Sequence, residues 1–148
     1  MKLNKILKTI PVNQIRYLAS ELDLPFYEYH NKIPQLIQKI SSKMKSESFI
    51  QHILESTGED EKELIQFIAS EGGELEYKEV IERYFGKENK KVKSIISSTI
   101  KTGIVFNYSL SIDGEILKFI IIPEPLSKFI KSVSYTHLRA HETSLHLV

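Results

Sequence analysis

The chain has 148 residues, enough for one domain or two small ones, and 41% of them are hydrophobic, which is enough for a packed core. Its 20 Lys and Arg nearly balance 19 Asp and Glu, which excludes a uniformly basic protein, and the lack of cysteine excludes disulfides and thiolate metal sites. No apolar run approaches membrane-spanning length, and no signal-peptide core follows Met1. We therefore expect a cytoplasmic protein.

Apolar spacing in residues 1–45 predicts a helical module of three short helices, over residues 2–10, 11–22 and 33–44. The Ile10–Pro11 step separates the first two, because the residue before a proline is pushed out of the helical region. An extended aromatic connector is expected over residues 26–31. The polar residues 41–46 are expected to be the linker to the rest of the chain.

The residues from Pro11 to Leu24 and from Lys32 to Ile40 resemble a SAP-like helix–extended–helix module. The glycine usual before the second helix of such modules is absent, and Tyr29-His30-Asn31 stands there. The resemblance implies DNA binding through candidate phosphate contacts at Arg16, Lys32 and Lys39. A plain helical hairpin that packs on its neighbours explains the same spacing, and both interpretations stay open.

Residues 46–131 begin with a helix over 46–55, whose start carries serines that can cap it. The next helix is expected from Asp60 and ends at Gly72-Gly73, since glycine commonly terminates helices. A short extended piece over 74–77, a helix over 78–85 and a lysine-rich helix over 89–102 follow.

Two β-rich runs come next, Ile104 to Ile112 and Ile116 to Ile122. Asp113-Gly114 between them predicts a two-residue type I′ turn, with Gly114 at positive φ. The order helix, extended piece, helix, helix and hairpin is that of a winged helix-turn-helix domain. The expected fold is therefore mainly α with a β-hairpin wing, in the α+β class, with the helical module in front of it.

The segment from about Glu61 to Ile130 resembles the winged helix found beside helicases of the XPB type. The resemblance rests on Thr102-Gly103-Ile104-Val105, on the Ile122-Pro123 step and on the run from Glu124 to Ile130. It implies association with a DNA-processing protein and does not make this chain a helicase. No phosphate-cradling loop, nucleophile elbow or other enzyme motif is present, so we expect no catalysis, no cofactor and no metal.

Charge is distributed in blocks along the chain. Residues 1–45 hold eight Lys and Arg against three acids, residues 55–82 two against ten, and residues 87–101 five against one. The acidic block would repel DNA, which leaves the lysine-rich helix, the hairpin and the N-terminal segment to face it. Lysines beside small hydroxyls suit contact with a phosphate backbone. The candidate contacts on that helix are Lys90, Lys91, Lys93, Ser94, Ser97, Ser98 and Lys101.

The expected function is that of a non-catalytic DNA-binding module from a truncated larger protein, with low sequence specificity. Three alternatives stay open: a solvated helix face with ordinary lysines, a winged helix that binds a protein partner or a second copy, and an accessory region of a DNA-processing enzyme such as a helicase. No membrane partner is expected. Salt-dependent binding to duplex DNA separates the first expectation from a protein-interaction module.

Residues 132–148 are expected to be a non-native tail. The run from Val133 to Thr143 resembles one translated frame of a transposase-type sequencing adapter, and the residues up to Val148 fit its continuation. His137 and His141 have the spacing of a zinc pair on a helix, but the adapter explains them without selection. The resemblance implies that the gene was cut near Ser132. We expect that removing the tail leaves the melting temperature unchanged.

Overall fold

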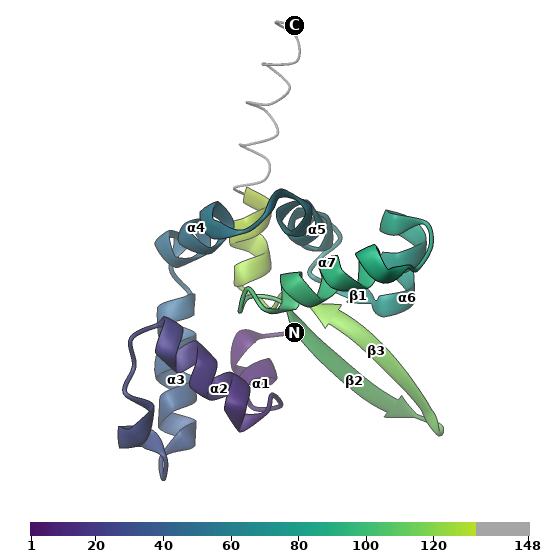
Figure 1. The fold of residues 1–148 in the computed structure, drawn as a ribbon. Helices are drawn as coiled ribbons and strands as arrows, with labels where there is room; N and C mark the ends of the chain where they lie inside the picture. Colours follow the sequence, from purple (N-terminus) through teal and green to yellow (C-terminus); the bar gives the residue numbers. More distant parts are fainter. Residues whose placement is uncertain (133–148) are drawn as a thin grey trace, which may run out of the picture.

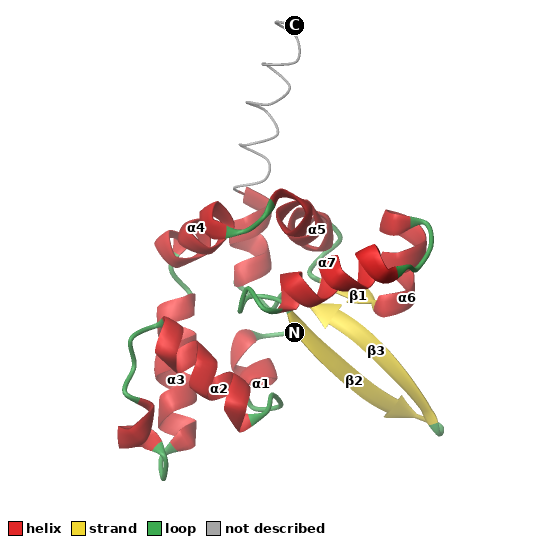
Figure 2. Ribbon diagram, viewed as in Figure 1, coloured by secondary structure: helices red, strands yellow, loops and turns green. Residues whose placement is uncertain are grey.

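Three short helices begin the computed structural model, which describes residues 1–132: α1 (Leu3–Leu7), α2 (Val12–Glu21) and α3 (Ile33–Met44) (Figures 1 and 2). The predicted helices are confirmed with small shifts: α1 ends before Ile10, and Pro11 is the N-cap of α2. Apart from Ser132, the proposed tail lies outside the described residues, as does its histidine pair.

Residues 26–31 are not extended, contrary to the prediction. Phe26–Tyr29 form a 3-10 helix, η1, in which Glu28 donates its backbone N–H to the carbonyl of Pro25 at 3.1 Å. Proline favours this arrangement, because its fixed φ starts a turn. The rings of Phe26 and Tyr29 pack against the core from this turn.

The linker predicted over residues 41–46 is also wrong for most of its length. Helix α3 continues to Met44, and the side chains of Ser41 and Met44 are buried. The structure thus follows the helix predicted over residues 33–44, which overlaps the expected linker, and packing fills the inward positions of its last turn. Helix α4 (Glu47–Ser56) starts almost at once, and Ser46 caps it as expected: its Oγ accepts the Phe49 N–H at 3.1 Å.

A small antiparallel sheet follows α5 (Glu59–Ser70). Its strands β1 (Glu74–Glu76), β2 (Phe106–Ile112) and β3 (Glu115–Ile121) lie in the order β1-β3-β2, with Leu75 opposite Ile120. The predicted hairpin turn is confirmed: Asp113 and Gly114 have φ of 50° and 81°, the positive sign that a type I′ turn needs at both positions. The short extended piece predicted over residues 74–77 therefore forms strand β1, which joins the hairpin in the sheet.

Between β1 and β2 lie α6 (Tyr77–Val80), a π-helical turn η2 (Ile81–Phe85) and α7 (Lys90–Ile100). Asn89 caps α7, since its Oδ1 accepts the Val92 N–H at 2.9 Å. Residues 126–132 are helical as well. The structure is therefore mainly helical with a small antiparallel sheet, as the expected α+β class requires.

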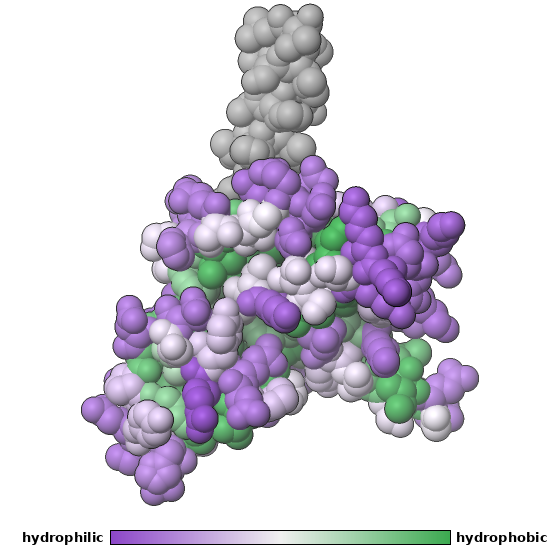
Figure 3. All heavy atoms as spheres, in the orientation of Figure 1, coloured by the Kyte–Doolittle hydropathy of each residue, from purple (hydrophilic) through white to green (hydrophobic). Residues whose placement is uncertain are grey.

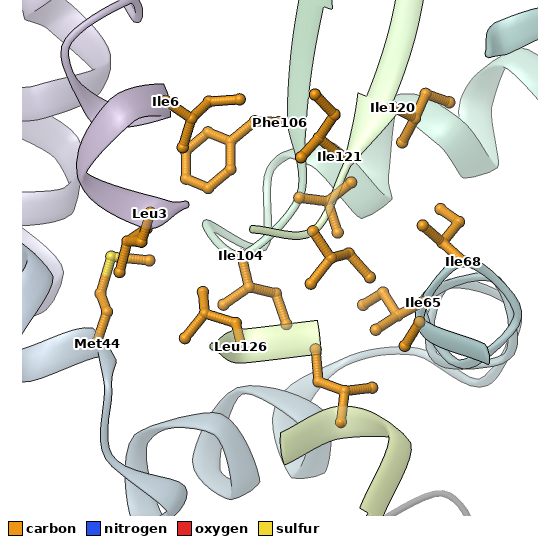
Figure 4. Packing of buried hydrophobic residues seen from close by; sticks show 14 of the residues in the cluster. Leu3, Ile6, Met44, Ile65, Ile68, Ile104, Phe106, Ile120, Ile121 and Leu126 are labelled. Atoms are coloured by element: carbon orange, nitrogen blue, oxygen red, sulfur yellow. The ribbon is translucent and has the colours of Figure 1, made fainter. Parts of the chain in front are cut away.

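One hydrophobic core joins the N-terminal helices to the sheet. Leu3 and Ile6 of α1 lie beside Phe106 and Ile121 of the hairpin, and Met44 of α3 lies beside Leu3 (Figure 4). The first residues also run beside the segment after β3, where residues 2 and 124 form a parallel bridge. The N-terminal helices and the part of the chain from residue 46 onward, which were predicted as two modules, therefore share one core.

Candidate nucleic-acid interface

Helix α7 carries six of the seven candidate contacts on its exposed surface, because its apolar side is buried, and the seventh, Lys101, is its exposed C-cap. Val92, Ile96 and Thr99 point inward, and the Thr99 hydroxyl is satisfied by donating to the carbonyl of Ile95 at 2.7 Å. A helix advances by about 100° per residue, so positions four, seven and eleven after the first share one row. The middle of the exposed face is therefore the row Lys90, Ser94, Ser97 and Lys101.

The two flanks of this row differ in their surroundings. Lys93 lies on the flank next to Ile96 and Ile100, which line a groove of about 580 Å³ between α7 and the sheet. The hairpin supplies the opposite wall with Asn107, Ser109 and Lys118, among other residues. The groove is thus bordered by lysines on both sides, from two elements that are distant in sequence.

Lys118 is a candidate that the sequence reasoning missed. It lies opposite Ser109 in the β2–β3 ladder and is exposed. It is the one lysine of β3, whose other charged residue is Glu115, so no run of lysines marks it. The one available signal was the alternation of the strand, which places Lys118 on the opposite face from the buried Ile121.

Glu88 is the carboxylate at this groove. It accepts the Tyr77 hydroxyl at 3.0 Å and lies 3.7 Å from Nζ of Lys93. Burial, and then the hydrogen bond to Glu88, raise the pKa of Tyr77 above its ordinary value. The Lys93–Glu88 pair is exposed and therefore weak, so Lys93 is free to exchange this partner for a phosphate.

The opposite flank of α7 is acidic. Ser98 and Lys101 line a second groove, of about 340 Å³, together with Glu21 of α2 and Glu61 of α5. The Tyr17 hydroxyl closes its end by donating to the carbonyl of Lys101 at 3.4 Å. Two carboxylates beside Ser98 make it the least suited of the seven candidates to a phosphate contact. The hairpin side is the more favourable one.

The N-terminal candidates form a separate group around η1. Cζ of Arg16 lies 4.8 Å from the centre of the Phe26 ring, and Nζ of Lys39 lies 5.3 Å from that of Tyr29. A side-chain hydrogen bond with Tyr29 raises the pKa of Lys39. Lys32 is the exposed N-cap of α3. Helix α2 reaches the C-terminal end of α7 through Tyr17, but the side chains of Arg16 and Lys39 pack on the rings of η1, and none of the three N-terminal candidates lines either groove beside α7. Figure 1 shows α3 on the far side of α2 from the hairpin.

Comparison of the chain with family models, with curated proteins and with solved structures gives no match. Within residues 1–132, no three His, Asp or Glu side chains are arranged to hold a metal ion. None of the helices in that range combines the length and apolarity needed to cross a membrane.

Proposed function

We propose that the chain is a non-catalytic DNA-binding module whose part from α5 to β3 is a winged helix. The element order α5, β1, α6–η2, α7 and hairpin supports this assignment, as does the antiparallel sheet in which β3 lies between β1 and β2. In this proposal α7 is the helix that approaches duplex DNA, and β2–β3 is the wing.

The observation that carries the proposal is the groove between α7 and the hairpin. Lys93 and Lys101 border it on one side and Lys118 on the other. A phosphate backbone in this groove meets cations from two directions, with the hydroxyls of Ser97 and Ser109 between them. Such contacts fix the position of a protein on DNA and carry no sequence information.

The same residues define the expected specificity. Helix α7 has no arginine, so it lacks the side chain that most often reads guanine with two hydrogen bonds. Its lysines and serines suit the sugar–phosphate backbone. We therefore infer binding to duplex DNA with little preference for sequence.

The test is the affinity of purified protein for a labelled duplex, measured by fluorescence anisotropy. Replacing Lys90, Lys101 and Lys118 by Gln should weaken binding to unrelated duplexes by the same factor, because each change removes a phosphate contact. A matched control replaces the three cations around η1, Arg16, Lys32 and Lys39, by Gln and should leave the affinity nearly unchanged. Glu61→Gln and Glu63→Gln should leave binding equal or slightly tighter. Equal losses in both cation sets would contradict an interface centred on α7.

A second function, docking on a protein, is favoured by the outer half of the hairpin. Leu110, Ile112 and Ile116 are 37%, 50% and 69% exposed, which is unusual for large aliphatic side chains gathered on one ribbon. A module of this kind can also be an accessory part of a DNA-processing enzyme. If the lysine variants bind DNA as the unchanged protein does, docking on a protein becomes the better explanation.

A further inference from the structure

Strand β2 is a sheet edge without the usual protection. It lies at the end of the order β1-β3-β2, and its seven residues include no charge and no proline. Within residues 1–132, the backbone of β2 is hydrogen-bonded to β3 and to no other segment. Natural edge strands commonly carry a lysine, a proline or a bulge, because free N–H and C=O groups recruit another strand.

The other exposed edges of the same sheet are protected. Strand β1 carries Glu74 and Glu76, and the free end of β3 carries Glu115 and Lys118. Pairing with a further strand would bring these charges beside it and desolvate them. The uncharged edge is therefore a particular property of β2 and not of the whole sheet.

The side chains of β2 alternate between an apolar and a polar face. Phe106, Tyr108, Leu110 and Ile112 lie on one face, and Asn107, Ser109 and Ser111 lie on the other. Leu117 and Phe119 of β3 continue the apolar face, since they lie opposite Leu110 and Tyr108. Figure 3 shows apolar surface toward the free end of the hairpin, at the lower right.

We propose that two copies of this chain associate by antiparallel pairing of their β2 strands, centred on Ser109. In this register Tyr108 lies opposite Leu110 of the second copy, and the paired stretch runs from Asn107 to Ser111, because Phe106 is fully buried in the core. Asn107 lies opposite Ser111. The strand is complementary to itself, as a two-fold symmetric interface requires. This inference does not depend on DNA binding.

The register follows from the period of the strand. A slip by one residue would place the apolar face of one copy beside the polar face of the other. Centring on Ser109 pairs the accessible residues 107–111. It also forms two continuous apolar rows, in each of which Leu117 and Leu110 of one copy are followed by Tyr108 and Phe119 of the other. Cross-strand pairs of this kind stabilise sheets.

Charge does not oppose the association. The cross-strand row at the symmetry axis contains Lys118 and Ser109 of each copy. Its nearest like charges are the two Lys118 side chains, which are three strand spacings apart, or about 14 Å. This separation exceeds the screening length of about 8 Å at physiological salt. Because apolar faces coincide, the symmetry axis is perpendicular to the sheet, and both α7 helices lie on the same side of it.

The first test is the dimer dissociation constant, measured by sedimentation equilibrium. Ser109→Lys places two like charges at the symmetry axis and should raise the constant by roughly tenfold or more. Ser109→Glu should do the same, and an equimolar mixture of the two variants should recover a dimer containing one chain of each. The matched control Ile116→Lys puts the same charge on the exposed neighbouring strand and should change the constant little. A monomeric unchanged protein, or equal effects at both positions, would overturn the proposal.

The second test uses the absence of cysteine from the sequence. Ser109→Cys places one thiol on each side of the axis, within the distance that a disulfide spans between directly opposite strand residues. Mild oxidation should give a covalent dimer, whereas Ile116→Cys should remain mostly monomeric. Equal crosslinking of both variants would show random collision and would overturn the register. Circular dichroism of every variant verifies that the fold is retained.

Discussion

Leu3 donates its backbone N–H to the carbonyl of Glu124 at 2.9 Å, and Glu124 donates in turn to the carbonyl of Met1 at 2.8 Å. These bonds join the first turn of the chain to the segment that follows the hairpin. The terminal ammonium of Met1 also pairs with the carboxylate of Glu74, beside the sheet. The N-terminal helices are thus part of the same folded unit as the sheet.

The first prediction concerns this shared core. Ile6 is fully buried, so Ile6→Ala should lower the free energy of unfolding by about 2–5 kcal/mol. Urea denaturation should show one transition, with helical and tyrosine signals changing together. Asn4→Ala, on the exposed side of the same helix, should change stability by less than about 0.5 kcal/mol. Two separate transitions would show that the segments fold independently.

The second prediction concerns the turn between α5 and β1. Gly73 has φ of 88°, and a Cβ at this position would lie 2.6 Å from the carbonyl oxygen of Ile122. The two backbones are held this close by a hydrogen bond of 2.7 Å from the N–H of Ile122 to the carbonyl of Gly73. Gly73→Ala should therefore destabilise the protein more than Gly72→Ala. The φ of Gly72 is 99°, but nothing lies within 4 Å of its Cβ position, so its cost is only the backbone strain of about 1–2 kcal/mol. Equal melting temperatures for the two variants would contradict this packing.

The third prediction concerns the hairpin turn. Gly114 adopts φ of 81°, where a β-branched side chain is strained. Gly114→Val should reduce the free energy of unfolding by about 1–2 kcal/mol, whereas Gly114→Asn should reduce it less, because asparagine tolerates this region. Chemical denaturation of the two variants measures the difference. No loss in the valine variant would show that the turn opens without cost to the rest of the protein.

Local signals made the second half of the fold predictable. Asp113-Gly114 determines its turn through its own backbone preferences, and Asn89 and Gly72-Gly73 mark helix ends by capping and by positive φ. These effects act within a few residues. The prediction therefore needed no knowledge of the rest of the chain.

Contacts between distant residues explain the errors. The linker expected over residues 41–46 is not a separate segment, because Met44 at the end of α3 packs beside Leu3, and the sequence does not state that these two residues meet (Figure 4). The acidic flank of α7 arises from the position of α2, which brings Glu21 into the groove that Ser98 lines. Lys118 belongs to the candidate site because β3 pairs with β2, which places Lys118 opposite Ser109. The winged-helix assignment and the DNA contacts themselves stay predictions.

The most direct measurement is the salt dependence of duplex binding. Each phosphate contact releases counterions, so the logarithm of the association constant should fall linearly with the logarithm of salt concentration, by about 0.9 per contact. The groove of Lys93, Lys101 and Lys118, together with Lys90, predicts a slope of roughly three to four, reduced by about one for each lysine replaced by Gln. A slope near zero, or one that does not change in the variants, would contradict the proposal that this face of α7 binds DNA.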